Sequence, residues 1–288
     1  MLIRESIHLT FFMPHAHDRA GPAVLRAIDA YLDAVGGART FGLSLDVDGD
    51  WQLLDGAEWS RNRAMLSNPK GCHVAMRNAD PFDERFAVEY LGWTRTPATP
   101  RVPETAVCAV SFWLPTEFLE EHGPHRVHDL ACTLARLLPF RSGYGGLAFN
   151  CSLDLAGILE RVYPLSFRYP GIDILDLENL ARHMGNRLRA SSWLTFLDSA
   201  VTEQLGGLPR LSQQLAVPGM SVQELGEGRV VVSTGAWPEA GDTQQGQSLP
   251  AHQALARVLE PHLYQQRVYP NDLFPPEEWR RWERRFLD

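Results

Sequence analysis

The strongest periodic pattern in the sequence lies between residues 127 and 138. Apolar residues recur there at the spacing of an amphipathic helix, and Pro139 ends the pattern. The next segment, residues 144–153, is rich in aromatic and small apolar residues, which is typical of a strand. A helix followed by a strand at this point indicates a mixed α and β fold.

The N-terminal half shows the same alternation. Residues 3–13 form an aromatic-rich run typical of a strand, and residues 24–35 have helical spacing that ends at two glycines. Further strands are predicted at residues 40–47, 85–93 and 105–114, the last two flanking a Pro-rich loop at 97–103. Residues 48–83 carry few periodic signals and are interpreted as a long connection. The order strand, helix, strands, helix, strand predicts a ferredoxin-like split βαβ sheet.

The C-terminal half is more helical. Helices are predicted at residues 155–162, 176–188 and 198–205, followed by a hairpin around Gly226-Glu227-Gly228 and two later helices that open at Pro250 and Pro275. We therefore expect an α+β chain with a ferredoxin-like half at 1–153, packed against a more helical α+β half at 154–288 as one compact body.

Charge and composition narrow the classes of function. The chain has 288 residues, 44% of them hydrophobic, and a formal net charge of −8. An acidic chain lacks the basic footprint that phosphate contacts require, so a nucleic-acid partner is not expected. The N-terminus has charges where a signal peptide needs an apolar core, and no stretch approaches a membrane span. These features predict a cytoplasmic protein with reduced cysteines and no membrane partner.

Few residues suggest catalysis. The sequence has no nucleophile elbow, no phosphate-binding P-loop and no dinucleotide-binding glycine motif after a strand, so neither a cofactor nor a catalytic residue is predicted. His15, His17 and Asp18 lie close together in the sequence and could bind a metal. A metal-dependent hydrolase that uses these three residues is therefore the alternative function.

The end of the chain offers a third hypothesis. Trp279, Trp282 and Phe286 form one stripe of a predicted helix, with arginines at 280, 281 and 284 on its other faces. Such a helix could stack on and clamp nucleic acid. An aromatic stripe at this spacing is more often docked on the body of its own protein, with the arginines in solvent.

Short motifs between residues 141 and 262 carry a family resemblance. They are YGGLAFN at 144–150, RYPGID at 168–173, HMGNRL at 183–188, SWLTFL at 192–197, LGG at 205–207, GAWPEAGD at 235–242 and LP at 249–250. Together they resemble the type VI secretion immunity family, the TsiV-like proteins. Residues 48–104 and the tail after 263 show no recognisable motif, so partner choice could reside there.

The resemblance implies a non-enzymatic inhibitor. Its partner would be a cognate secreted effector toxin encoded nearby, with a nuclease as the first expectation, and the inhibitor would either cover the active site or lock the toxin in an inactive shape. High affinity needs aromatic or arginine anchors inside a polar rim. Such anchors are expected in the loops at 48–63, 94–103 and 237–248. The candidate partner-binding residues are Asp48, Asp50, Trp51, Glu58, Trp59, Trp237, Glu239 and Asp242.

Overall fold

The computed structural model describes residues 3–79, 85–94, 102–153, 155–265 and 275–288. The chain divides into two compact units. Unit 1 contains residues 1–7, 142–179 and 187–288, and unit 2 contains residues 8–141 and 180–186. In the described ranges, no helix is both long enough and apolar enough to cross a bilayer.

Unit 2 is built on a sheet with the strand order β3-β2-β4-β5-β6-β1. Its strands are β1 (Arg4–Met13, which begins in unit 1), β2 (Leu43–Leu45), β3 (Trp51–Leu53), β4 (Cys72–Arg77), β5 (Ala87–Gly92) and β6 (Cys108–Pro115). From β3 to β6, each strand pairs antiparallel with the next. β3 therefore forms an outer edge of this sheet.

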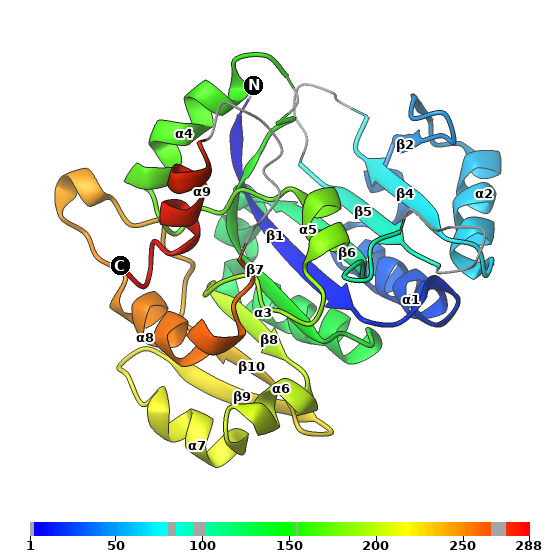
Figure 1. Ribbon diagram of the computed structural model, residues 1–288. Coiled ribbons are helices and arrows are strands. Elements are labelled where there is room, and N and C mark those ends of the chain that lie inside the picture. The colour runs from blue at the N-terminus through cyan, green and yellow to red at the C-terminus, as the bar shows by residue number, and fades with distance from the viewer. Residues whose placement is uncertain (1–2, 80–84, 95–101, 154, 266–274) are drawn as a thin grey trace. The chain divides into compact units, whose positions relative to one another are not determined.

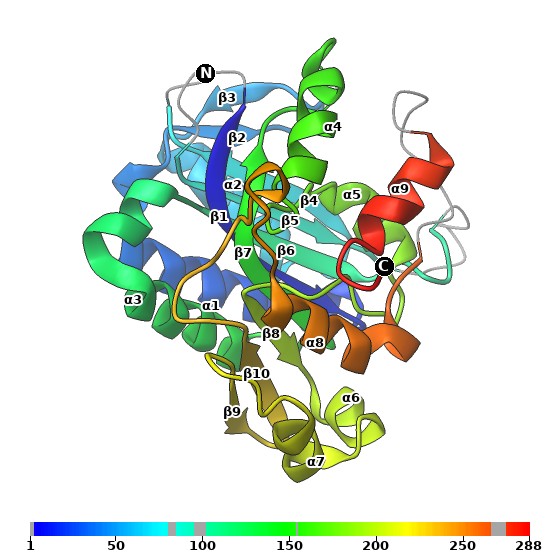
Figure 2. The same ribbon diagram turned by 90° about the vertical axis from the view of Figure 1, so that its left-hand side faces the viewer.

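Three helices cover one face of that sheet. They are α1 (His17–Val35), α2 (Gly56–Ser67) and α3 (Thr116–Leu137). α1 contacts α2, α3, β5 and β6, and Figures 1 and 2 show α1 and α3 side by side. The buried face of α1 includes Tyr31, whose hydroxyl donates a 2.5 Å hydrogen bond to the Trp113 carbonyl on β6. α1 and α3 thus pack their apolar faces on the sheet, as their sequence periodicity predicts.

Unit 1 has the strand order β7-β8-β10-β9, all antiparallel. The strands are β7 (Ser142–Asn150), β8 (Leu194–Leu197), β9 (Ser221–Gly226) and β10 (Arg229–Ser233). The helices are α4 (Ile158–Arg168), α6 (Ser199–Gln204), α7 (Gly207–Gln214), α8 (Pro250–Leu259) and α9 (Pro276–Glu283), while α5 (Leu177–His183) begins in unit 1 and ends in unit 2. The β9–β10 turn is at Gly226-Glu227-Gly228, and all three residues have positive φ, which confirms the predicted hairpin.

The C-terminal helix α9 is part of the core of unit 1. Trp279, Trp282 and Phe286 are 2%, 0% and 4% exposed, and the first two pack with residues of α4 and β7. The aromatic stripe therefore docks on the protein, so it does not offer a stacking platform for nucleic acid.

One sequence interpretation was wrong. The stretch at 48–83, expected to be a connection, contains β3, α2 and β4. β3 has only three residues, and α2 buries only Asn62 and Leu66, so neither element produces a clear apolar period. The mixed α and β class is confirmed, whereas the ferredoxin-like layout stays a prediction.

A candidate interaction surface on the β2–β3 hairpin and helix α2

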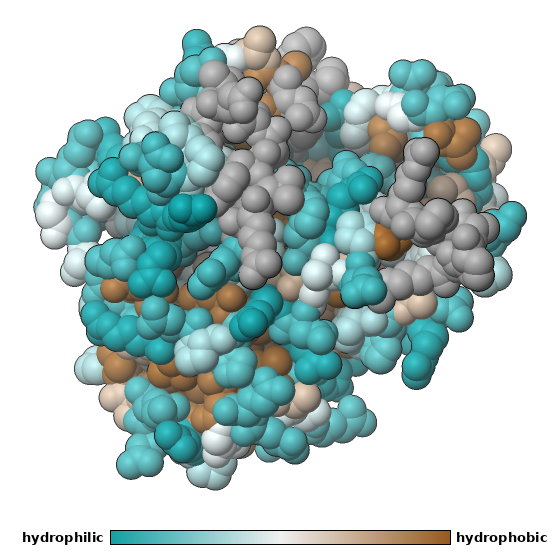
Figure 3. Space-filling view, in the orientation of Figure 1, coloured by the Kyte–Doolittle hydropathy of each residue, from teal (hydrophilic) through white to brown (hydrophobic). Residues whose placement is uncertain are grey.

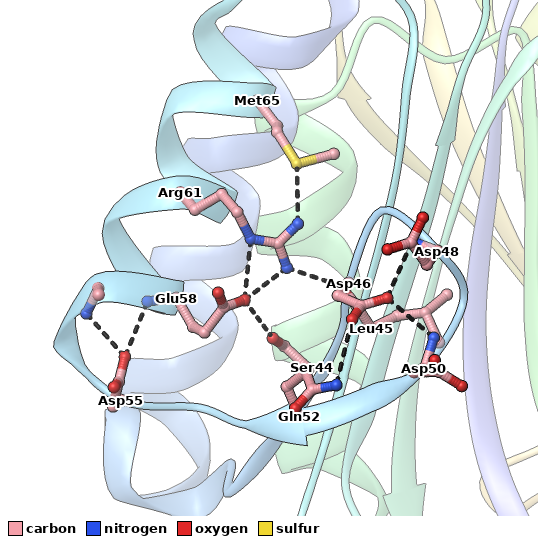
Figure 4. Close-up of polar contacts among 11 residues, drawn as sticks. Ser44, Leu45, Asp46, Asp48, Asp50, Gln52, Asp55, Glu58, Arg61 and Met65 are labelled. Atoms are coloured by element: carbon pink, nitrogen blue, oxygen red, sulfur yellow. Dashed lines mark hydrogen bonds and ion pairs between the residues drawn. The ribbon is translucent and has the colours of Figure 1, made fainter.

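A single aspartate shapes the turn between β2 and β3. The Asp46 Oδ1 atom accepts hydrogen bonds from the backbone N–H groups of Asp48 and Asp50, both at 2.9 Å, and Oδ2 accepts one from Gln52 Nε2 at 3.1 Å (Figure 4). These bonds, led by that from the Asp50 N–H, lower the pKa of the Asp46 carboxyl. Gly49 takes the left-handed conformation that the turn needs, with φ of 90°. The turn is thus held by its own charged residue.

Helix α2 is anchored to the same hairpin. The Asp55 carboxylate caps its first turn by accepting the N–H groups of Ala57 and Glu58 at 2.8 and 2.9 Å. Arg61 donates to the Glu58 carboxylate from Nε at 2.8 Å and to the Leu45 carbonyl at 2.9 Å (Figure 4). Arg61 therefore ties α2 to β2, and it also compensates the charge of Glu58 within the protein.

Exposed apolar side chains gather on this hairpin. Val47, Trp51 and Leu53 are 77%, 40% and 75% exposed, and Figure 3 shows hydrophobic residues among hydrophilic ones over β2 and α2. Only two other large hydrophobic residues of the described ranges are comparably exposed, Leu155 and Trp237. Three such residues within seven positions form an apolar patch, which is typical of an interaction site.

The aromatic member of this patch is held in place. Trp51 lies opposite Leu45 on β2, and Arg77 of β4 stacks its guanidinium 3.9 Å from the centre of the Trp51 ring. A stacked cation reduces the rotational freedom of the indole before any partner arrives. The Trp51 ring is therefore restrained within the protein itself.

Carboxylates border the apolar patch. Asp48 and Asp50 are exposed, and no ion pair between described residues involves either of them. Trp59 on α2 is half-buried, with the Arg63 guanidinium 5.3 Å from its ring. Five of the sequence-predicted residues thus belong to one segment of unit 2, residues 48–59.

The other three predicted residues lie in unit 1. Trp237 is 48% exposed and Glu239 is exposed, whereas Asp242 is only 5% exposed. The Arg168 guanidinium binds Asp242 through two hydrogen bonds of 3.1 and 2.8 Å, which lower the pKa of that carboxyl. Asp242 therefore fixes its loop to the end of α4, leaving Trp237 and Glu239 as the accessible members.

A hollow of about 520 Å³ lies beside this loop of unit 1. Its walls come from the two turns that carry the RYPGID and GAWPEAGD motifs, and its lining residues include Tyr169, Glu239, Asp242 and Leu249. The turns interlock, because the Gly171 N–H donates a 2.8 Å hydrogen bond to the Ala240 carbonyl. These motif residues thus hold the two turns together.

Sequence reasoning missed two residues of the hairpin, Val47 and Leu53. Val47 is the last residue of the strand predicted at 40–47, and Leu53 lies in the stretch interpreted as a connection, so neither was expected to be an exposed contact residue. The available signal was the alternation of Trp51 and Leu53 around Gln52, which is typical of a strand but too short to decide. The loop at 94–103 lies largely outside the described residues, which omit 95–101.

The metal-dependent hydrolase is not supported. The His17 ring is fully buried, with Nδ1 2.8 Å from the Tyr90 hydroxyl and Nε2 3.1 Å from the Met65 carbonyl. Asp18 is exposed, and His15 is half-buried with a pKa lowered mainly by burial. Within the described ranges, no three His, Cys, Asp or Glu residues could hold a metal ion. His17 instead joins α1 to β5 and to the end of α2.

Comparisons with known proteins identify the family and a similar fold. Among curated proteins, no relative matches the sequence. A solved structure, the Pseudomonas aeruginosa T6SS protein PA0821, has a similar fold with a TM-score of 0.80 and 17% identity, covering 99% of this chain and 82% of that chain. The sequence model of the TsiV family, described as type VI immunity for VRR-NUC, matches residues 23–286. The chain therefore belongs to the TsiV family of type VI immunity proteins.

Proposed function

We propose that this protein binds a VRR-NUC effector through the surface formed by residues 46–59 and thereby blocks the nuclease. The family assignment supports the activity. One observation carries the choice of surface: Val47, Trp51 and Leu53 are exposed beside Asp48 and Asp50, whose carboxylates form no ion pair with any described residue. In protein interfaces, a tryptophan surrounded by charged residues is a typical binding hot spot.

Charge complementarity favours occlusion of the nuclease's DNA-binding face. A nuclease holds the phosphate backbone with cationic side chains, so the face that meets DNA is basic. The protein carries a net charge of −8, and two of its carboxylates, Asp48 and Asp50, lie on the surface at 46–59 with no cationic partner among the described residues. Opposite charge would speed the encounter and direct the inhibitor to the face that DNA needs.

The candidate residues divide into contacts and supports. Asp48, Asp50 and Trp51 would touch the effector directly. Glu58 and Trp59 would support them from α2, because Glu58 already pairs with Arg61 at 2.8 Å. In unit 1, Trp237 and Glu239 would form a second, smaller contact on a loop that Asp242 holds. The ranking follows from exposure and from the number of apolar anchors on each surface.

The cellular setting and the wider architecture belong to the same proposal. The protein would act in the cytoplasm as a stoichiometric inhibitor, without an enzymatic step, against an effector encoded nearby. The first half would be a ferredoxin-like layout enlarged by β2, β3, α2 and β4, and the chain would divide near residue 153. The adjacency of β5, β6 and β1 supports the ferredoxin-like part.

The test combines protection and binding. A bacterial host would express a VRR-NUC effector with and without this protein at matched effector levels, and DNA cleavage by the purified effector would be titrated with the protein. We expect growth rescue, and loss of cleavage at a one-to-one ratio of active molecules. The absence of both effects with every candidate effector, both proteins being folded, would contradict the proposed function.

Matched variants separate the two surfaces. Trp51→Ala, in the surface at 46–59, is compared with Trp237→Ala, in the loop of unit 1, since both side chains are close to half exposed. We expect Trp51→Ala to weaken binding by about 2 kcal/mol or more and Trp237→Ala to cost less. The reverse order would move the main contact to unit 1.

A further inference from the structure

The outer edge of the unit 2 sheet presents hydrogen-bonding groups that β2 does not use. The pairs Asp46–Asp50 and Gly42–Leu54 are joined by backbone hydrogen bonds of 2.9 Å each, one pair beyond each end of β3. Hydrogen-bonded pairs alternate along an antiparallel ladder, so the next such pair between them is Ser44–Gln52. The backbone groups of Trp51 and Leu53 consequently point away from β2, toward the open edge.

Three of these outward groups are available. The Leu53 carbonyl accepts a 3.0 Å hydrogen bond from the Asp55 N–H. Among the described residues, the Trp51 N–H, the Trp51 carbonyl and the Leu53 N–H face no neighbouring strand, because β3 is the last strand in the order. An open edge of this kind is a template for another strand.

The side chains of β3 do not protect this edge. The edge strand of unit 1, β9, exposes Ser221, Gln223 and Glu224, polar residues of the kind that discourage pairing with another chain. All three residues of β3 are exposed, and two of them are Trp51 and Leu53. An apolar edge that no described strand covers is open to pairing with a strand of a partner.

We propose that an extended segment of the effector adds as a strand to β3, so that the Trp51 and Leu53 backbone groups pair with it. The inference rests on the proposed function and names its recognition mode. Trp51 and Leu53 lie on one face of β3, while Asp50 and Gln52 lie on the other. The segment that fits alternates apolar residues, packed against Trp51 and Leu53, with lysine or arginine facing Asp50 and Asp48.

Amide exchange tests the backbone pairing directly. The full-length protein is measured by residue-resolved hydrogen exchange, alone and bound to the purified VRR-NUC domain of an effector whose toxicity it relieves. We expect the Trp51 and Leu53 amides to exchange freely alone and to be slowed by roughly a hundredfold or more in the complex. Unchanged exchange of both amides in a saturated complex would overturn strand addition while leaving the proposed function intact.

A matched pair of variants adds a binding measurement. Leu53→Pro removes the outward N–H without touching the β2 ladder, whereas Leu53→Val keeps that N–H and a similar side chain. We expect Leu53→Pro to raise the dissociation constant by roughly tenfold or more and Leu53→Val by much less. Equal affinities of two folded variants would overturn the proposal, and if the proline variant fails to fold, the amide measurement decides. If the wild-type protein forms no complex with the effector, both the proposed function and this inference are wrong.

Discussion

Arg189 and Glu283 form an ion pair inside unit 1. The Arg189 Nη1 atom lies 3.1 Å from Glu283 Oε1, and the two side chains are only 3% and 8% exposed. Glu283 is the last residue of α9, and Arg285, just after it, stacks 3.9 Å from the centre of the Trp282 ring and lies 3.5 Å from Asp173. The C-terminal helix is thus fixed by buried charges as well as by its aromatic stripe.

We predict that Glu283→Ala destabilises the protein by about 3 kcal/mol, the low end for breaking a buried ion pair, because Arg189 loses this partner and keeps Asp173 at 3.8 Å. The control is Glu278→Ala on the same helix, whose pair with Arg281 is 3.5 Å long and has the arginine side chain 69% exposed. That change costs about 0–1 kcal/mol. Urea unfolding of both variants checks the difference, and equal midpoints would contradict it.

Stability is expected to depend on pH through His252. Burial, with a smaller contribution from Arg285, lowers the pKa of His252 from 6.5 to about 4. Its ring nitrogens lie 3.4 Å from Ser191 Oγ and 3.2 Å from Thr234 Oγ1, and the ring stacks on Phe286 at 4.9 Å. The unfolded chain binds the proton more readily between these two pKa values. The stabilisation is therefore complete above pH 6.5 and is lost as pH falls toward 4, by about 3 kcal/mol.

His252→Gln isolates this contribution. Glutamine keeps polar atoms near Ser191 and Thr234 but does not titrate. We expect the difference in unfolding free energy between wild type and variant to shrink between pH 6.5 and pH 4, measured by chemical denaturation at several pH values. A difference that stays constant across this range would show that His252 is not the source of the pH dependence.

A glycine in the RYPGID motif is expected to be intolerant of a side chain. A Cβ atom on Gly171 would lie 1.9 Å from the Glu239 carbonyl oxygen, so the loop carrying Trp237 and Glu239 would have to move. We predict that Gly171→Ala costs about 1–3 kcal/mol. Gly56→Ala is the control, because nothing lies within 4 Å of a Cβ there and the residue begins α2. Thermal unfolding compares the two, and an unaffected Gly171→Ala would mean that the loop yields at no cost.

The fold could be predicted where the spacing of apolar residues in the sequence matches the side chains that the fold buries. The apolar face of residues 127–138 forms the second part of α3, and the helix is broken at Gly123, which has non-helical angles and precedes Pro124. Of the three elements missed at 48–83, β3 has only three residues, and α2 is held to β2 by polar contacts such as that of Arg61 with the Leu45 carbonyl, 16 positions away. Contacts between residues that are distant in sequence leave no local period to detect.

The kinds of residue on the candidate surface could be predicted from the sequence, but their arrangement in space could not. Exposed Trp51 and the neighbouring aspartates were identified from composition alone. The sequence could not show that Asp242 is engaged by Arg168, because the two residues are 74 positions apart. It also could not show that β3 is an outer strand, since edge position depends on the order of all strands in the sheet.

The carboxylates of the hairpin should govern how fast the effector is captured. Asp48 and Asp50 have no cationic partner among the described residues, so their field acts on an approaching basic protein. We predict that Asp48→Asn with Asp50→Asn lowers kon for the effector by roughly tenfold at low salt and changes koff less, because exposed charges act mainly on the encounter. Stopped-flow association measures this effect.

Two controls separate the effect of the hairpin carboxylates from that of the protein's net charge: a change of ionic strength and a charge-matched variant. Raising the ionic strength to about 0.5 M should bring wild type and variant together, because screening then removes most of the long-range attraction. The control is Asp33→Asn with Glu120→Gln, two exposed residues on α1 and α3, which changes the net charge by the same amount. If this control slows association as much as the hairpin variant, the net charge of the protein is responsible and the hairpin has no special part in capture.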